Sequence, residues 1–158
     1  MASCGNENKD KSQPKIQGKL INYSDCKENE NELTQSSYEI ANSLSQVDYL
    51  YDTSKKTLTL KHINSAFNCC PDNLVCRISF ENDTIIIEER ENITEKCRCK
   101  CLYDLEILVR SVEPEKYSIK FIEPYYSGEE KIIFDIDLAI KTEGSFSVTR
   151  NEYPWSFE

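Results

Sequence analysis

The stretch Cys97-Arg98-Cys99-Lys100-Cys101-Leu102-Tyr103-Asp104-Leu105-Glu106-Ile107-Leu108-Val109-Arg110 decides the fold of this chain. Cysteine, tyrosine and aliphatic residues occupy its odd-numbered positions, whereas charged residues occupy most of its even-numbered positions. A period of two is typical of a β-strand that buries one face and exposes the other. The sequence therefore predicts a half-buried strand in which three cysteines continue the hydrophobic row on the inward face.

Short alternating runs separated by polar turns surround this strand from about Val47 onward. The predicted strands are residues 49–51, 57–63, 74–80, 84–88, 97–109, 116–122 and 132–140, with Phe146 and Val148 in a last one. The first four form two hairpins, and the charged residues 89–96 are expected to form a loop. About seven short strands without a convincing long helix indicate an all-β fold, an antiparallel β-sandwich of the immunoglobulin or fibronectin type III kind. A small β-barrel is the alternative architecture.

The turn from Val112 to Tyr117 bears on the immunoglobulin-like detail. It resembles the turn before the penultimate strand of fibronectin-type domains, where a tyrosine hydroxyl bonds back to the preceding loop as a tyrosine corner. The alternative is an inward tyrosine that merely follows a proline turn.

Length and charge limit the kind of protein. A chain of 158 residues fits one domain plus a tail, because one hydrophobic core usually serves ~100 to 150 residues. The net charge of −9 argues against a nucleic-acid partner, because affinity for phosphates comes mainly from lysine and arginine. Residues 1–46 are mostly polar, so we divide the chain into a flexible N-terminal tether (1–46) and a β-sandwich domain (47–158).

The start of the chain indicates export and lipidation. Ala2-Ser3-Cys4-Gly5 resembles the end of a bacterial lipobox, in which the cysteine is diacylated after the signal peptide is removed. We therefore expect lipidation at Cys4 and a location in the bacterial cell envelope, lipid-anchored at the outer membrane or periplasmic face. The lipid is the only membrane contact that we predict. The alternative is an ordinary cytosolic start with a chance cysteine.

Eight cysteines in an exported domain predict disulfide bonds. Cysteines at i and i+2 of a strand lie roughly 6.5 to 7 Å apart, which is too far for a bridge between them. The three cysteines of the central strand should therefore pair with other segments, although six cysteines allow fifteen pairings. Cys26 is left over and is expected to be free, intermolecular or bonded across to the domain. The disulfide candidates are Cys69, Cys70, Cys76, Cys97, Cys99 and Cys101.

A thiolate metal site is the alternative use of these cysteines. Converging thiolates bind zinc or copper(I), and His62 could join them. The spacing matches no zinc-finger pattern, and an oxidising compartment favours bridges. We therefore predict no metal and no cofactor, and we interpret His62 as a hydrogen-bonded core histidine.

Signatures of catalysis are missing from the sequence. The chain has one histidine and contains no Gly-x-Ser-x-Gly elbow, no glycine-rich phosphate loop and no His-Glu-x-x-His helix. We therefore predict that the protein is not an enzyme.

Three segments resemble a group of small, uncharacterised lipoproteins of Bacteroides-type bacteria. They are the run from His62 to Pro71, the run from Cys99 to Leu105, and the closing run from Arg150 to Trp155. The resemblance implies an envelope location and a β-rich domain, and it implies no activity. Tyr153 and Trp155 are candidate binding aromatics, and docking of the C-terminus is their alternative role.

These observations together predict a non-catalytic binding or structural module of the cell envelope, stapled by disulfides, with an unknown protein or glycan partner. The alternative is a thiol-dependent metal-binding (zinc or copper) or redox protein of the envelope.

Overall fold

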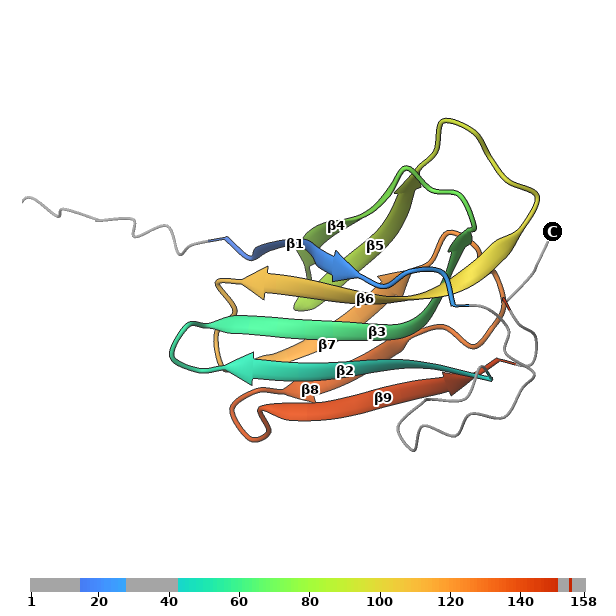
Figure 1. Ribbon diagram of the computed structural model, residues 1–158. Coiled ribbons are helices and arrows are strands. Elements are labelled where there is room, and N and C mark those ends of the chain that lie inside the picture. Colours follow the sequence, from blue (N-terminus) through green and yellow to red (C-terminus); the bar gives the residue numbers. More distant parts are fainter. Residues whose placement is uncertain (1–14, 28–42, 151–153, 155–158) are drawn as a thin grey trace, which may run out of the picture.

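The computed structural model describes residues 15–27, 43–150 and 154. Within them, nine strands form two sheets that pack face to face (Figure 1). The five-stranded sheet has the order β1-β6-β3-β2-β9, and the four-stranded sheet has the order β4-β5-β7-β8. The strands are β1 (Gln17–Tyr23), β2 (Leu44–Asp52), β3 (Thr57–Asn68), β4 (Asn73–Glu81), β5 (Thr84–Asn92), β6 (Lys100–Arg110), β7 (Lys116–Ile122), β8 (Ile133–Asp137) and β9 (Glu143–Thr149). The predicted all-β sandwich is confirmed.

The immunoglobulin-like detail of the prediction is not confirmed. The sandwich has nine described strands instead of about seven, and β5 pairs with β7 in parallel. A parallel neighbour requires a crossover connection, and here β6 supplies it, because the chain leaves the four-stranded sheet after β5 and returns to it at β7.

No helix able to cross a membrane is found among the described residues.

The core lies between the two sheets and follows the alternation of the sequence. In β6, Leu105, Ile107 and Val109 have no exposed surface, and in β5 the same holds for Ile85 and Ile87. Burying a side chain of this size stabilises the fold by about 1.5 to 3 kcal/mol. The central strand therefore decides the fold as its pattern predicts, with β1 on one side of it and β3 on the other.

The predicted boundary at Val47 is too late. Strand β1 pairs with β6 along most of its length, from Gln17 opposite Arg110 to Tyr23 opposite Leu105. The sandwich therefore begins within the part predicted as a tether. The sequence predicts only a short strand at residues 19–23 within the tether, because β1 lies at an edge of the sheet, where most of its side chains stay exposed.

Two turns differ in how well the sequence predicted them. The Tyr117 hydroxyl accepts a hydrogen bond from the backbone N–H of Glu113 at 3.1 Å, which is the bond predicted for a tyrosine corner. In contrast, the predicted inward row of the 132–140 strand ends before Ile140, which is 84% exposed. The chain turns after β8 because the backbone carbonyl of Asp137 accepts the N–H groups of Ile140 and Lys141.

Strand β3 contains a bulge that changes which face its residues occupy. The register to β6 shifts between His62 and Ser65, and Asn64 adopts a positive φ of 65°. Asparagine tolerates this conformation better than most residues. Because the bulge inserts an extra residue, His62 and Ser65 both point into the interior, although an odd spacing would place them on opposite faces of a regular strand.

Candidate functional site

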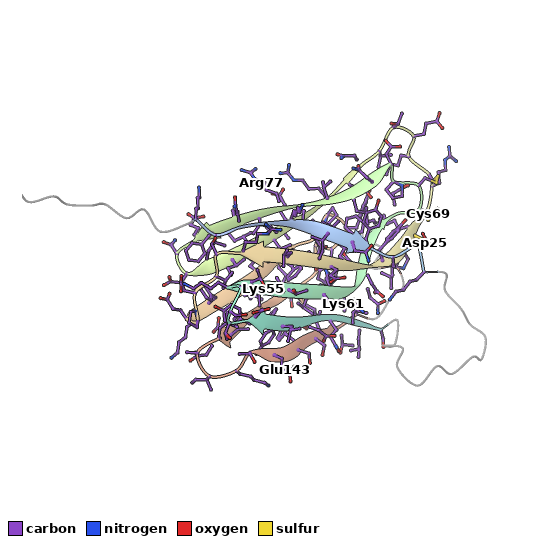
Figure 2. The ribbon with its side chains drawn as sticks, turned by 60° about the vertical axis from the view of Figure 1, so that its left-hand side comes forward. Asp25, Lys55, Lys61, Cys69, Arg77 and Glu143 are labelled. Atoms are coloured by element: carbon purple, nitrogen blue, oxygen red, sulfur yellow. A yellow bond between two sulfur atoms is a disulfide. The ribbon has the colours of Figure 1, made fainter. Side chains whose placement is uncertain are left out.

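Three disulfides join six of the seven described cysteines at one end of the sandwich. They are Cys26–Cys101, Cys69–Cys99 and Cys70–Cys97, with sequence separations of 75, 30 and 27. Figure 2 shows Cys69 at this end, together with Asp25 of the segment that follows β1. Of the alternatives predicted for Cys26, the bond across to the domain is the one observed.

The prediction of an inward row of three cysteines is correct only for Cys101, which is 3% exposed. Cys97 and Cys99 precede β6, and Cys99 is exposed. Cys97 and Cys99 stay outside the strand because the Asn68 side chain holds the segment before β6 against the loop after β3. The Asn68 amide donates to the carbonyl of Cys97 at 2.7 Å and accepts the N–H groups of Cys97 at 3.2 Å and Cys70 at 3.0 Å.

Cys76 was predicted as a disulfide candidate, and this prediction is wrong. It is a free cysteine in β4, directly opposite Glu89 of β5. Burial and the nearby charge of Glu89 raise the pKa of the Cys76 thiol far above its usual range. The thiolate is the reactive form of cysteine, so Cys76 is a poor partner for exchange with the three bridges.

A buried polar network links the two sheets beneath the bulge of β3. His62 has no exposed surface, and its Nδ1 contacts the carboxylate of Glu89 at short range. The second carboxylate oxygen of Glu89 accepts the hydroxyl of Ser65 at 2.5 Å. The other ring nitrogen of His62 lies 2.8 Å from the Ser45 hydroxyl. The interpretation of His62 as a hydrogen-bonded core histidine is confirmed.

A second ion pair extends the network. The Arg150 guanidinium donates to both carboxylate oxygens of Glu123 at 2.7 Å each, and it stacks 3.5 Å from the ring centre of Tyr126. An oxygen of Glu123 lies 3.9 Å from Nε2 of His62. Burial alone would lower the pKa of His62, but the charges of Glu89 and Glu123 and the bond to Glu89 outweigh it and raise this pKa. His62 and Arg150 are therefore the two basic side chains that face Glu89 and Glu123 in this network.

The order Ser45–His62–Glu89 resembles the hydroxyl–imidazole–carboxylate order of hydrolase triads. However, Ser45 and His62 have no exposed surface, so the hydroxyl has no contact with solvent and no substrate carbonyl can reach it in this conformation. His62, Glu89 and Glu123 could also hold a metal ion by distance. Their donor atoms instead contact Ser45, Ser65 and Arg150, and we assign the network a structural role.

The sequence analysis missed most of this network. Glu89 falls in the predicted loop 89–96, but β5 continues to Asn92 and buries Glu89 to 2% exposure. The signal that could have found it is the alternation of Ile85 and Ile87, which places residue 89 on the same inward face. The ion pair of Glu123 with Arg150 had no comparable signal, because both residues follow the ends of strands.

The outer face of the five-stranded sheet carries a depression with a volume of about 680 Å³. Four residues lie opposite one another there on neighbouring strands and form one rung of the sheet. They are Lys19 of β1, Leu108 of β6, Thr59 of β3 and Leu50 of β2. The residues that line the depression are Leu50, Asp52, Lys55, Lys56, Thr57, Thr59, Leu108, Arg110 and Ser111. A smaller depression formed by Gln17, Gly18, Lys19, Leu108 and Arg110 adjoins it. We call this combined surface the basic face.

The charges of the basic face are opposite to the net charge of the chain. Its lining includes Lys19, Lys55, Lys56 and Arg110 but only one acid, Asp52. Lys56 forms an ion pair with Glu113 at 2.8 Å and Lys55 lies 3.8 Å from Asp52, so Lys19 and Arg110 are the lining cations outside these two pairs. Asp52 is engaged locally, because backbone and hydroxyl groups of the hairpin loop donate to its carboxylate and lower its pKa. Figure 2 shows Lys55 at the β2–β3 turn, on one end of this face.

Comparison of the chain with protein-family models, curated proteins and solved structures finds no match. Three of the predicted site residues, namely Cys4, Tyr153 and Trp155, lie outside the described residues.

Proposed function

We propose that this protein is a non-catalytic binding module of the bacterial cell envelope, held to the membrane by a lipid on Cys4 and stapled by its disulfides. It binds an acidic segment of a protein partner on the basic face. The observation that carries the proposal is the local excess of positive charge on this face of a chain whose net charge is −9.

The disulfides support the location outside the cytosol, because such bonds form and persist in oxidising compartments and are rare elsewhere. They also support a structural use of the cysteines, because a sulfur in a disulfide is not available as a thiolate ligand. The thiol-dependent metal-binding alternative would require reduction of at least two of the bridges.

The chemistry of the basic face favours a protein over a glycan. Leu50 is 56% exposed at its centre, and Leu108 lies two strands away on the same rung. Cations surround this apolar centre, and no aromatic ring for stacking on a sugar lines the depression. An extended segment that alternates acidic and aliphatic side chains matches both features, and complementary charges accelerate and orient such an encounter.

Titration with a defined peptide tests the binding face. We would add a short synthetic peptide of alternating glutamate and leucine to 15N-labelled protein and follow the backbone amide signals by NMR. We expect shifts at Leu50, Thr59 and Leu108, and loss of binding in the Lys19→Glu/Arg110→Glu variant. The matched control is Arg77→Glu/Lys131→Glu, which changes the net charge equally at exposed positions outside the basic face.

Three results would contradict this part of the proposal. Equal weakening in both variants would indicate non-specific attraction, and shifts confined to other surfaces would place the partner elsewhere. Binding of polygalacturonate in preference to the peptide would favour a glycan partner.

The anchor is tested separately by expressing the chain behind an export signal, because Cys4→Ser should move the protein from the membrane to the soluble fraction.

A further inference from the structure

Two of the disulfides lie against each other. The Sγ atoms of Cys26, Cys69 and Cys101 all lie within 4.8 Å of one another, although Cys69 is bonded to Cys99 and the other two are bonded together. These sulfurs come from three separate segments, namely the stretch after β1, the loop after β3 and the start of β6. A sulfur of one bridge is therefore within reach of both sulfurs of the next.

The two bridges differ in their exposure to solvent. Cys99 is exposed, whereas Cys26 is half-buried and Cys101 is 3% exposed in a cluster with Phe67, Leu74 and Tyr103. Cys70 of the third bridge is also exposed, which is why the control variant removes that bridge. Attack by a thiolate on a disulfide depends on access to the attacked sulfur. An external thiol therefore reaches the Cys69–Cys99 bridge at Cys99 before it reaches the Cys26–Cys101 bridge.

We propose that these two bridges form a thiol–disulfide relay, through which an external dithiol acting at Cys99 opens the bond at Cys26. This activity is independent of the basic face and of the lipid anchor. It requires only the oxidised sandwich and a dithiol reductant.

The relay consists of balanced exchange steps. A thiolate of the dithiol attacks Cys99, a new S–S bond forms there, and the electron pair of the broken bond leaves on Cys69. The Cys69 thiolate attacks Cys101, forms a Cys69–Cys101 bond, and the electron pair leaves on Cys26, which takes a proton. The second thiol of the reductant then attacks its own sulfur in the mixed disulfide and releases Cys99 as a thiol.

The net result is one oxidised dithiol, one disulfide between Cys69 and Cys101, and thiols at Cys26 and Cys99. The consequence lies at the N-terminal segment. The Cys26–Cys101 bond cross-links the segment after β1 to β6, so after the relay β1 is held to β6 by hydrogen bonds and packing only. The nearby Cys76 thiol does not compete for these sulfurs, because it is held protonated by its surroundings.

Peptide mapping after limited reduction tests the relay. Oxidised protein would be treated with one equivalent of dithiothreitol, quenched with acid, alkylated and analysed by mass spectrometry. We expect alkylated Cys26 and Cys99 and a Cys69–Cys101 peptide pair. The control variant Cys70→Ser/Cys97→Ser should give the same products, whereas alkylation of Cys26 should fall about tenfold in Cys69→Ser/Cys99→Ser because only direct attack remains.

Two outcomes would overturn the proposal. One is alkylation of Cys69 and Cys99 in the native chain with the Cys26–Cys101 bond intact. The other is equal alkylation of Cys26 with and without Cys69 and Cys99. The single variant Cys99→Ser gives an independent test if the double variant fails to fold, because its Cys69 thiol should exchange without reductant and yield both Cys26–Cys101 and Cys69–Cys101 forms. Only the native bond in this variant would also overturn the relay.

Discussion

Replacement of Glu89 by glutamine should destabilise the sandwich in a way that depends on pH. Glu89 is 2% exposed and bonds both His62 and Ser65. Glutamine keeps the shape but removes the charge, so the two charge-assisted bonds become neutral ones. Because a hydrogen bond to a charged group is worth about 1.5 to 3 kcal/mol and a buried ion pair loses about 3 to 5 kcal/mol when one partner is removed, we expect a loss of about 2 to 4 kcal/mol.

The pH dependence follows from the direction of the His62 shift. The folded-state pKa of His62 is raised above its unfolded value of about 6.5. The stability that comes from protonated His62 is therefore fully present below that unfolded pKa and is lost as the pH rises through the folded pKa. In Glu89→Gln the main source of the upward pKa shift is gone, and burial then disfavours the imidazolium, so the stability lost as the pH rises above the unfolded pKa should shrink.

Urea unfolding of oxidised protein from pH 5 to pH 9, followed by circular dichroism, measures both effects. The matched control is Glu88→Gln, because Glu88 is the preceding residue in β5 and its ion pair with Arg90 is exposed. An exposed pair contributes about 0 to 1 kcal/mol. The reasoning would be refuted if Glu88→Gln and Glu89→Gln lost equal stability, or if the pH profile of Glu89→Gln matched that of the native chain.

Three further changes should have measurable effects. The Cys70→Ser/Cys97→Ser variant should lose about 3 kcal/mol in urea unfolding, because this bridge closes a loop with a separation of 27 residues; no change would mean that the loops stay together without it. Asn68→Ala should cost about 1 to 3 kcal/mol and produce mispaired cysteines on air oxidation, visible by peptide mapping, whereas the neighbouring exposed change Asn73→Ala should not. Asp83→Gly should raise the free energy of unfolding by about 0.5 to 1 kcal/mol, because Asn82 and Asp83 both adopt positive φ in the β4–β5 turn and glycine relieves that backbone strain. A drop in the thermal midpoint would show that the Asp83 side chain stabilises the turn by more than its backbone strain costs.

The sequence predicted the strands that alternate without interruption. The inward residues of β6 from Leu105 to Val109 were predicted because apolar side chains recur at every second position, and burial follows that period of two. The same rule failed at β1, where edge exposure removes the apolar face, and at the bulge near Asn64, where an extra residue changes the face without changing the composition.

The candidate sites were less accessible to sequence reasoning. The pairing of Cys26 with Cys101 joins residues 75 positions apart, and no local pattern encodes such a contact. The network of His62 required Glu89 to be recognised as a core residue, which its charge opposes. The basic face brings together Lys19, Lys55 and Arg110 only through the order of the strands, and that order includes a crossover that composition does not reveal.

The pairing of β2 with β9 has a consequence for how the chain matures. Leu44 lies opposite Thr149, so the second strand of the sandwich is not covered on its free side until β9, the last described strand, has been made. During synthesis in the N-to-C direction, β2 and β3 can form a hairpin early, yet one side of that hairpin stays unpaired until β9 emerges. An open strand side of this kind attracts other chains, so shielding of the nascent protein should matter most in the interval before β9 arrives.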